Sequence, residues 1–229
     1  MVDLLKRESS CFPFIKLLSE EYKNIIKKTD KIIYFGNLNI YKKILNIKKI
    51  SPGIFFHPKY FHVSEYSNFV SEFMLNKYRY SLAKDLVLKE AMFVRPNSNS
   101  KPFPGQIFSK EKWEKYKRQI ASDEVVCWSS PKAIHSEYRF FVVETRISSW
   151  CLYQKNYSSK KIKDISLVYS FAKQVIRHFQ PQKVFVLDIC LTDNISPKIV
   201  EYNAFGCSVG YNCKLDIVAK DILESYKRN

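Results

Sequence analysis

The stretch VFVLDICLTDNISPKIVEYN, residues 184–203, contains two apolar runs separated by a polar segment. Symmetric folding about a turn at residues 194–195 pairs Asp188 with Glu201. Because side chains alternate along a strand, Asp188, Glu201 and Asn203 then share one face of the hairpin. The opposite face is apolar, with Leu187 facing Tyr202 and Ile189 facing Val200. The sequence therefore predicts an antiparallel hairpin with one carboxylate- and amide-bearing face.

The two opposed carboxylates of this hairpin repel each other unless positive charge lies between them. A divalent cation supplies that charge, and oxygen donors of this kind suit Mg²⁺ bound to nucleotide phosphates. The alternatives are a solvated sheet face on which Asp188 and Glu201 are merely hydrated, and a register shifted by one residue, which would disperse the cluster. The hairpin alone leaves these interpretations open.

Two further segments contain charged residues next to predicted strands. In EYRFF, Glu137 and Arg139 lie two residues apart on a predicted strand and share a face, either as a local ion pair or as a phosphate site. In FVRPNSNSKPFPGQIFS, a strand ends at Arg95 and a polar loop carries Lys101 before Gly105. Such a loop is either a surface turn or a cover for phosphates. It matches neither the GxxxxGK[ST] nor the GxGxxG fingerprint.

The remaining pattern alternates short strands with amphipathic helices, which indicates an α+β fold. Expected strands cover residues 31–36, 91–96, 106–108 and 125–129, and a hairpin over 136–154 turns near Glu144 and Thr145. Expected helices cover residues 14–28, 64–76 with Ser64 as N-cap, a stretch from the Ser109 cap to 120, 163–180, and a last helix from about Asp216. The change of pattern near residue 90 suggests a small α/β region at 1–90 and a second domain at 91–229.

The ordered set RP-x4-K-x-F-x-G-x-I-F, then E-x-R-F-F-V-V, then V-L-D-I and I-V-E-Y-N resembles the ATP-grasp superfamily. More narrowly, it is similar to the small ATP-grasp proteins found largely in bacteria and their viruses. The resemblance covers roughly residues 50–216. It implies two α+β lobes that hold ATP between them, preceded by a small N-terminal region.

The resemblance also implies roles for individual residues. Lys101 would contact the ATP phosphates from a flexible loop, and Glu137 would join the nucleotide site. Arg139 would stabilise phosphate, and Arg95 would meet phosphate or an acidic substrate, which makes Arg95, Lys101 and Arg139 the candidate catalytic residues. The adenine would meet backbone amides of a hinge formed by Val125, Val126, Cys127 and Trp128. Magnesium would be held by Asp188, Glu201 and Asn203.

The activity that the resemblance implies is an ATP- and Mg²⁺-dependent carboxylate–amine ligase that acts through an acyl phosphate. Its partners would be ATP, a carboxylate and an amine, either small molecules or an acidic protein or peptide. Many such ligases carry an arginine two residues before the strand aspartate, where this chain has Val186; Arg139 or Arg95 would then substitute for it. An ATP-binding regulator without turnover is therefore one alternative.

Composition bears on the other alternative, a basic nucleic-acid-binding module. The chain has 38 Lys and Arg against 22 Asp and Glu, a net charge of +16. These lysines are spread over every segment, so a dedicated nucleic-acid surface is not favoured. No apolar run is long enough for a membrane span and no signal pattern opens the chain, so a cytoplasmic location is expected. The six cysteines and four histidines lack metal-ligand spacing, which predicts reduced thiols and structural histidines.

Overall fold

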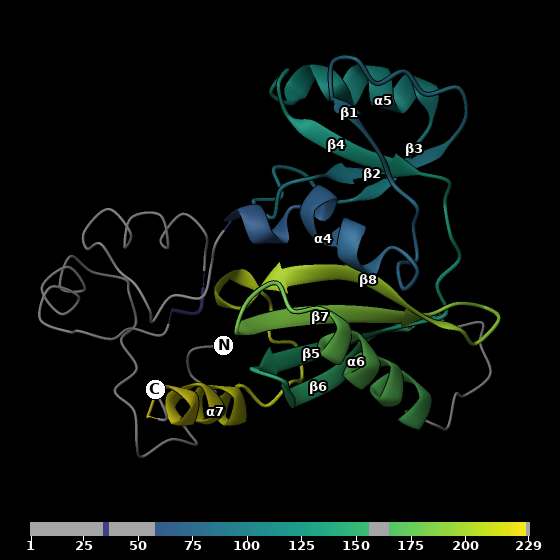
Figure 1. The fold of residues 1–229 in the computed structure, drawn as a ribbon. Helices are drawn as coiled ribbons and strands as arrows, with labels where there is room; N and C mark the ends of the chain where they lie inside the picture. The colour runs from purple at the N-terminus through teal and green to yellow at the C-terminus, as the bar shows by residue number, and fades with distance from the viewer. Residues whose placement is uncertain (1–33, 37–57, 156–164, 228–229) are drawn as a thin grey trace, which may run out of the picture.

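The computed structural model describes residues 34–36, 58–155 and 165–227 (Figure 1). The helix predicted over 14–28 lies outside the described residues, as does most of the strand predicted over 31–36. Tyr34 to Gly36 form no strand. Instead the backbone nitrogen of Gly36 donates a hydrogen bond of 2.7 Å to the carbonyl of Gly206. Two lobes account for most of the described chain (Figure 1).

The upper lobe in Figure 1 is a four-stranded antiparallel sheet in the order β1-β4-β2-β3. Its strands are β1 (Arg79–Leu82), β2 (Met92–Pro96), β3 (Gln106–Phe108) and β4 (Val125–Ser129). Helix α5 (Lys110–Tyr116) and the short helix η2 (Lys117–Gln119) cover it. The predicted cap is confirmed, because Ser109 Oγ accepts from the Lys112 amide at 3.3 Å. Trp113 is buried beneath α5 and its Nε1 donates to the Leu86 carbonyl at 3.0 Å.

The domain boundary expected at residue 90 would cut through this upper lobe. Strand β1 pairs with β4, and Leu86 and Leu88 enter the same apolar core as Trp113. The residues from β1 onward therefore belong to the same sheet and core as β2, β3 and β4.

The lower lobe is a second antiparallel sheet in the order β6-β5-β7-β8, with a helix against each face. Its elements are β5 (Ser136–Val143), β6 (Arg146–Lys155), α6 (Ser166–His178), β7 (Val184–Leu191), β8 (Pro197–Ala204), η3 (Phe205–Cys207) and α7 (Leu215–Lys227). The hairpin turn predicted at Glu144 is confirmed. Glu144 has φ 56°, as a tight turn can require. Both long helices predicted in this half are also confirmed.

Alternation along β5 divides its side chains between the two cores. Tyr138, Phe140 and Val142 pack with the apolar stripe of α6, whereas Phe141 and Val143 pack with α7. On the face of the sheet that α7 covers, the cross-strand pair Phe141–Val186 is apolar. The next pair on the same face, Arg139–Asp188, is charged. Helix α7 thus covers one part of this face, and the polar part carries the candidate site.

Helix α4 (Val63–Val70), preceded by η1 (Pro58–Phe61), lies between the upper lobe and β8 (Figure 1). The ring of Tyr66 packs against that of Tyr202 with centroids 5.0 Å apart. The predicted start at a Ser64 cap is wrong, because the helix is capped from another part of the chain. The Ser64 amide donates to Asn97 Oδ1 at 2.8 Å, and Asn97 Nδ2 donates to Ser64 Oγ at 3.0 Å. A cap that is 33 residues away in the sequence leaves no local signature.

The β7–β8 hairpin confirms part of the predicted register. Asp188 pairs with Glu201, but a bulge follows, and Ile189 pairs with Ile199 instead of Val200. Ile199 is therefore the residue that enters the core, while Val200 is only half-buried and faces the opposite way. The extra residue in β8 bends the strand without separating Asp188 from Glu201.

Candidate functional site

The centre of the site is a buried ion pair between neighbouring strands. Arg139 on β5 lies directly across from Asp188 on β7. Its Nε donates to Asp188 Oδ1 at 2.8 Å, and its Nη2 donates to Oδ2 at 2.6 Å. Asp188 is fully buried and Arg139 is 6% exposed. Burial raises the pKa of Asp188, and the bidentate arginine opposes that effect. The pair is a fixed charge-assisted contact beneath the site.

Glu201, the second carboxylate, is bound by two cations from the upper lobe. Arg95 Nη2 lies 2.6 Å from Oε2, and Lys101 Nζ lies 2.8 Å from Oε1. Burial alone would raise the pKa of Glu201, but the charges of Lys101 and Arg95 outweigh it and hold that pKa below its usual range. The repulsion expected between the opposed carboxylates is thus relieved by the chain's own cations.

Asn203 connects the two carboxylates. Its Nδ2 donates to Asp188 Oδ2 at 2.9 Å and to Glu201 Oε1 at 2.8 Å. Its Oδ1 accepts from Asn99 Nδ2 at 3.2 Å. The predicted common face of Asp188, Glu201 and Asn203 is therefore present, with the amide lying between the acids.

The loop after β2 reaches across to this face. Asn99 Oδ1 accepts from the Ala204 amide at 3.3 Å, in addition to the bond from Asn99 to Asn203. Lys101 has φ 46°, a left-handed conformation, and its side chain reaches Glu201. The loop carries Lys101 to the site as predicted, and Asn99 anchors it to β8.

Sequence reasoning missed two aromatic residues beside Arg139. The rings of Tyr153 on β6 and Tyr211 stack with centroids 4.7 Å apart, and the Arg139 guanidinium lies 5.1 Å and 4.9 Å from them. The Tyr153 hydroxyl donates to Glu137 Oε2. Burial raises the pKa of Glu137 despite this bond. The β5–β6 alternation could have suggested Tyr153, but a bulge interrupts it, and no pattern marks Tyr211 in its loop.

A cavity of about 590 Å³ lies between the lobes and above these residues. Four predicted site residues line it: Arg95, Lys101, Glu137 and Glu201. Arg139, Asp188 and Asn203 do not line it. Asn203 connects them to it, because its amide donates to the lining residue Glu201 and to Asp188, which Arg139 binds. Apolar side chains also line it: Leu75, Phe93, Pro96, Phe103, Pro104, Ile107, Pro131, Ala133, Ile134 and Val200. A space lined by both apolar and charged side chains suits a ligand that has both kinds of group.

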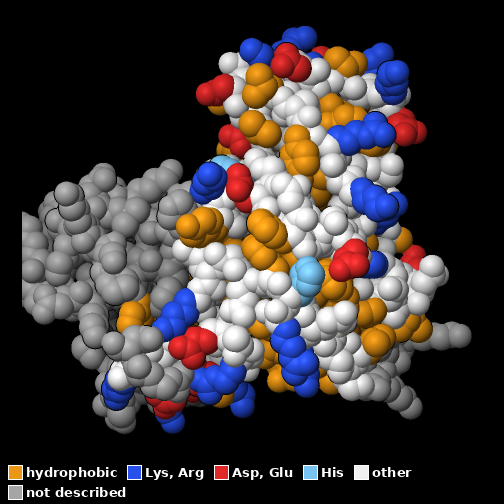
Figure 2. Space-filling view, viewed as in Figure 1, with side chains coloured by type: hydrophobic (Ala, Val, Ile, Leu, Met, Phe, Trp, Pro, Cys, Tyr) orange, Lys and Arg blue, Asp and Glu red, His pale blue; other side chains and the backbone are white. Residues whose placement is uncertain are grey.

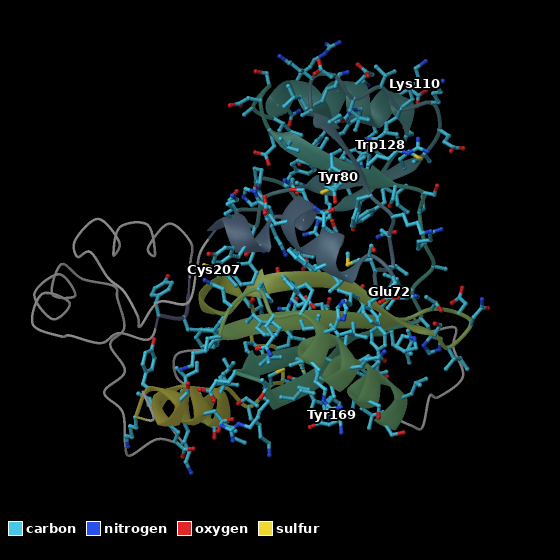
Figure 3. All side chains as sticks on the ribbon, in the orientation of Figure 1. Glu72, Tyr80, Lys110, Trp128, Tyr169 and Cys207 are labelled. Carbon is cyan, nitrogen blue, oxygen red and sulfur yellow. The ribbon has the colours of Figure 1, made fainter. Side chains whose placement is uncertain are left out.

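The predicted hinge, Val125 to Trp128, does not line this cavity. These residues form β4, which pairs with β1 on one side and β2 on the other, so much of their backbone is committed to the sheet. Figure 3 shows Trp128 within the upper lobe near Tyr80. The connection that follows β4 lines the cavity instead, from Pro131 to Ile134. Within the described chain, the backbone of Lys132 and Ala133 makes no hydrogen bond.

The donor set fits a hard cation. The described residues contain no group of three or more His, Cys, Asp and Glu side chains that could hold a metal. The candidate set is instead two carboxylates and one amide, whose oxygens are the type that Mg²⁺ prefers. His178 has a structural setting, since one of its ring nitrogens lies 2.9 Å from the Phe69 carbonyl. The five described cysteines form no disulfide among themselves.

Residues 72–220, well over half of the chain, match the family model described as ATP-grasp domain, R-2-K clade family 2. The chain belongs to this ATP-grasp family. The fold class expected from the sequence is thereby confirmed.

Solved structures of ATP-grasp proteins share the fold. A D-alanine–D-alanine ligase from Bacillus anthracis has a TM-score of 0.57 at 13% identity, over 97% of this chain and 90% of that chain. The ATP-grasp ligase PsnB, complexed with a minimal precursor, gives 0.53 at 10% identity over 82% and 71%. A RimK domain protein from Sphaerobacter thermophilus gives 0.50 at 11% identity, and this chain spans 62% of its length. No curated protein matches the sequence.

Two observations bear on other classes of function. No helix among the described residues has the length and apolar character to cross a membrane. On the face seen in Figure 2, Lys and Arg side chains are dispersed over both lobes with Asp and Glu between them. This face therefore carries no continuous basic patch of the kind that binds nucleic acid.

Proposed function

We propose that this ATP-grasp protein is an ATP- and Mg²⁺-dependent ligase that joins a carboxylate to an amine. The observation that carries the proposal is the face formed by Asp188, Glu201 and Asn203, set against three cations at the cavity between the lobes. The substrates are small molecules or a peptide or protein group. PsnB, which shares the fold, is described with a precursor peptide. The proposal includes a cytoplasmic location, where ATP and Mg²⁺ are available.

The nucleotide would lie along the length of the cavity. Adenine would occupy the apolar region, with Val200 beneath it and the free backbone of Lys132 and Ala133 at its edge. The phosphates would lie over Glu201, within reach of Arg95 and Lys101. Asp188, Glu201 and Asn203 would hold magnesium, which supplies positive charge that orients the phosphates and neutralises them.

The reaction would proceed in two displacements. An oxygen of the substrate carboxylate attacks the γ-phosphorus of ATP, and ADP leaves. The amine then attacks the acyl carbon of the resulting acyl phosphate, phosphate leaves with the electron pair of the broken C–O bond, and the nitrogen loses a proton. Arg95, Lys101 and Arg139 would stabilise the charge that develops on the transferred group. No nucleophilic side chain of the protein is required.

Thermal unfolding with Mg·AMPPNP, a nucleotide analogue that resists hydrolysis, tests the nucleotide site. At a concentration of about 100 times Kd, binding to the folded state should raise Tm by about 5–10 °C. Glu201→Gln should reduce this rise by most of its size. Exposed Glu65, which lies outside the cavity, provides a matched control, Glu65→Gln. Absence of any rise in the wild type would overturn the proposal, especially if oligonucleotides bound in a salt-sensitive manner.

Turnover needs a separate measurement, because an ATP-binding regulator would show the same Tm rise. Release of ADP from ATP should depend on adding both a carboxylate and an amine, screened as amino acids and acidic peptides. Stabilisation by the nucleotide with no acceptor-dependent ADP release across the screen would favour the regulator.

A further inference from the structure

The ion pairs around Glu201 and Asp188 have a consequence for how metal enters the site. Both oxygens of Glu201 are engaged by cations, and both oxygens of Asp188 are engaged by Arg139. Two carboxylates are thus opposed by three cationic side chains of the same chain. Their negative charge is neutralised internally.

A divalent cation that arrives alone therefore meets an unfavourable site. To bind Glu201, the metal ion must displace Lys101 or Arg95. It would then lie close to both positive charges. If Arg95 is the cation that is displaced, its side chain, which is only 7% exposed, is left buried without an anionic partner. Removing one partner of a buried ion pair is strongly destabilising. Nucleotide phosphates change this balance, because they provide new anionic partners for the displaced cations.

Lys101 is the cation best placed to exchange. Its side chain is 39% exposed, against 7% for Arg95, and it extends from a loop rather than from a strand. Lysine also presents a compact charge on a flexible stem, so it can turn from one anion to another without reorienting a planar group. Asn99 is bonded to Asn203 and Ala204, so it keeps the loop close to β8 both before and after Lys101 changes its anionic partner.

We propose that Lys101 is an exchangeable counter-ion of Glu201, which keeps free divalent metal out of the site until nucleotide phosphates take over the lysine. Metal and nucleotide then bind together, and neither binds well alone. This inference rests on the proposed function, since it requires a nucleotide at the same cavity.

The test measures Mn²⁺ as a magnesium substitute, with its free concentration read from the electron paramagnetic resonance signal. The full-length wild type should bind Mn²⁺ weakly when no nucleotide is present. Its affinity for Mn²⁺ should be at least about tenfold higher in the presence of AMPPNP. Lys101→Met should bind Mn²⁺ alone about tenfold more tightly than the wild type, because Glu201 has lost one counter-ion. The same variant should bind AMPPNP more weakly, because it has lost a phosphate contact. A purely structural role for Lys101 would not change the two affinities in opposite directions.

Three further variants sharpen the result. Lys101→Arg keeps the charge and should bind Mn²⁺ alone as weakly as the wild type, whereas Lys101→Gln should behave like Lys101→Met. Lys110→Met removes one exposed lysine on α5, at the top of the upper lobe in Figure 3, and should change neither affinity. It controls for the loss of one unit of net charge.

The outcomes separate the inference from the function. Equal Mn²⁺ affinity for wild type and Lys101→Met without nucleotide, together with normal AMPPNP binding to the wild type, would overturn the inference and leave the proposed function intact. Failure of the wild type to bind AMPPNP with or without metal would instead overturn the proposed function.

Discussion

At the scale of single residues, Asp188 and Glu201 are each paired with a different arginine. Val186, where many relatives are expected to carry an arginine, lies in the core under α7. The cross-strand neighbour Arg139 reaches Asp188 instead, and Arg95 from the other lobe reaches Glu201. The sequence left open which of the two arginines would substitute. The geometry assigns one to each acid.

Replacement of Glu201 by Gln should lower the free energy of unfolding by about 3 kcal/mol at pH 7, because Arg95 loses its anionic partner while buried. The pKa of Glu201 is lower in the folded chain than its ordinary value of 4.5. The wild-type advantage should therefore be fully present above about pH 4.5 and should decrease as the pH falls below it. Urea denaturation of both proteins between pH 7 and pH 3 measures this difference.

The matched control is Glu65→Gln, which alters an exposed carboxylate and should change the free energy of unfolding by less than about 0.5 kcal/mol at each pH. A difference between wild type and Glu201→Gln that stayed constant from pH 7 to pH 3 would contradict the assigned ion pairs.

At the scale of elements, the bulge in β8 separates the structural and functional faces of the hairpin. It moves Ile199 into the core beside Ile189 and turns Val200 toward the cavity. The sequence could not reveal this, because both residues are β-branched and apolar. Only packing against α4 and α6 decides which of the two is buried.

Ile199→Ala and Val200→Ala therefore provide a paired test. Ile199→Ala should lower the free energy of unfolding by about 2–4 kcal/mol, because it leaves a cavity in a fully buried site. Val200→Ala should cost less than about 1 kcal/mol, because Val200 is only half-buried, but it should weaken AMPPNP binding. Urea denaturation and nucleotide titration measure the two effects. The reverse order of stabilities would indicate the register without the bulge.

At the scale of the whole molecule, two sheets with separate cores are joined by the connection 130–135, by α4 and by the loop that carries Asn99 and Lys101. The net charge of +16 is a property of the whole chain. On the face seen in Figure 2, the Lys and Arg side chains of the described residues are dispersed rather than gathered in one patch, so we expect an excess of positive charge to act mainly as self-repulsion.

Salt should accordingly stabilise the fold. Raising NaCl from about 20 to 150 mM shortens the Debye length and screens repulsion among the surface cations, so Tm should increase by about 2–4 °C for each kcal/mol gained. Differential scanning fluorimetry at matched pH measures the shift, with KCl as a control for specific sodium binding. A decrease in Tm would show that attractive surface pairs outweigh the repulsion.

Much of the secondary structure was predictable because its causes are local. The apolar stripe of α6, the Ser109 cap and the turn at Glu144 are each specified within a few residues. A helix was correctly expected at α4, but its start was misjudged because the residue that caps it, Asn97, comes from a tertiary contact. Tyr153 and Tyr211 were missed for the same reason, since only the folded chain stacks them beside Arg139.

The sequence by itself determined the two strands that carry Asp188, Glu201 and Asn203, because a short hairpin and the two-residue alternation place these side chains on one face. The tertiary structure alone decided which cations meet them. Lys101 and Glu201 are 100 residues apart in the sequence, and no local periodicity reports a contact of that range. The packing of two lobes across one cavity brings them to 2.8 Å and turns an unexplained pair of acids into a neutralised site.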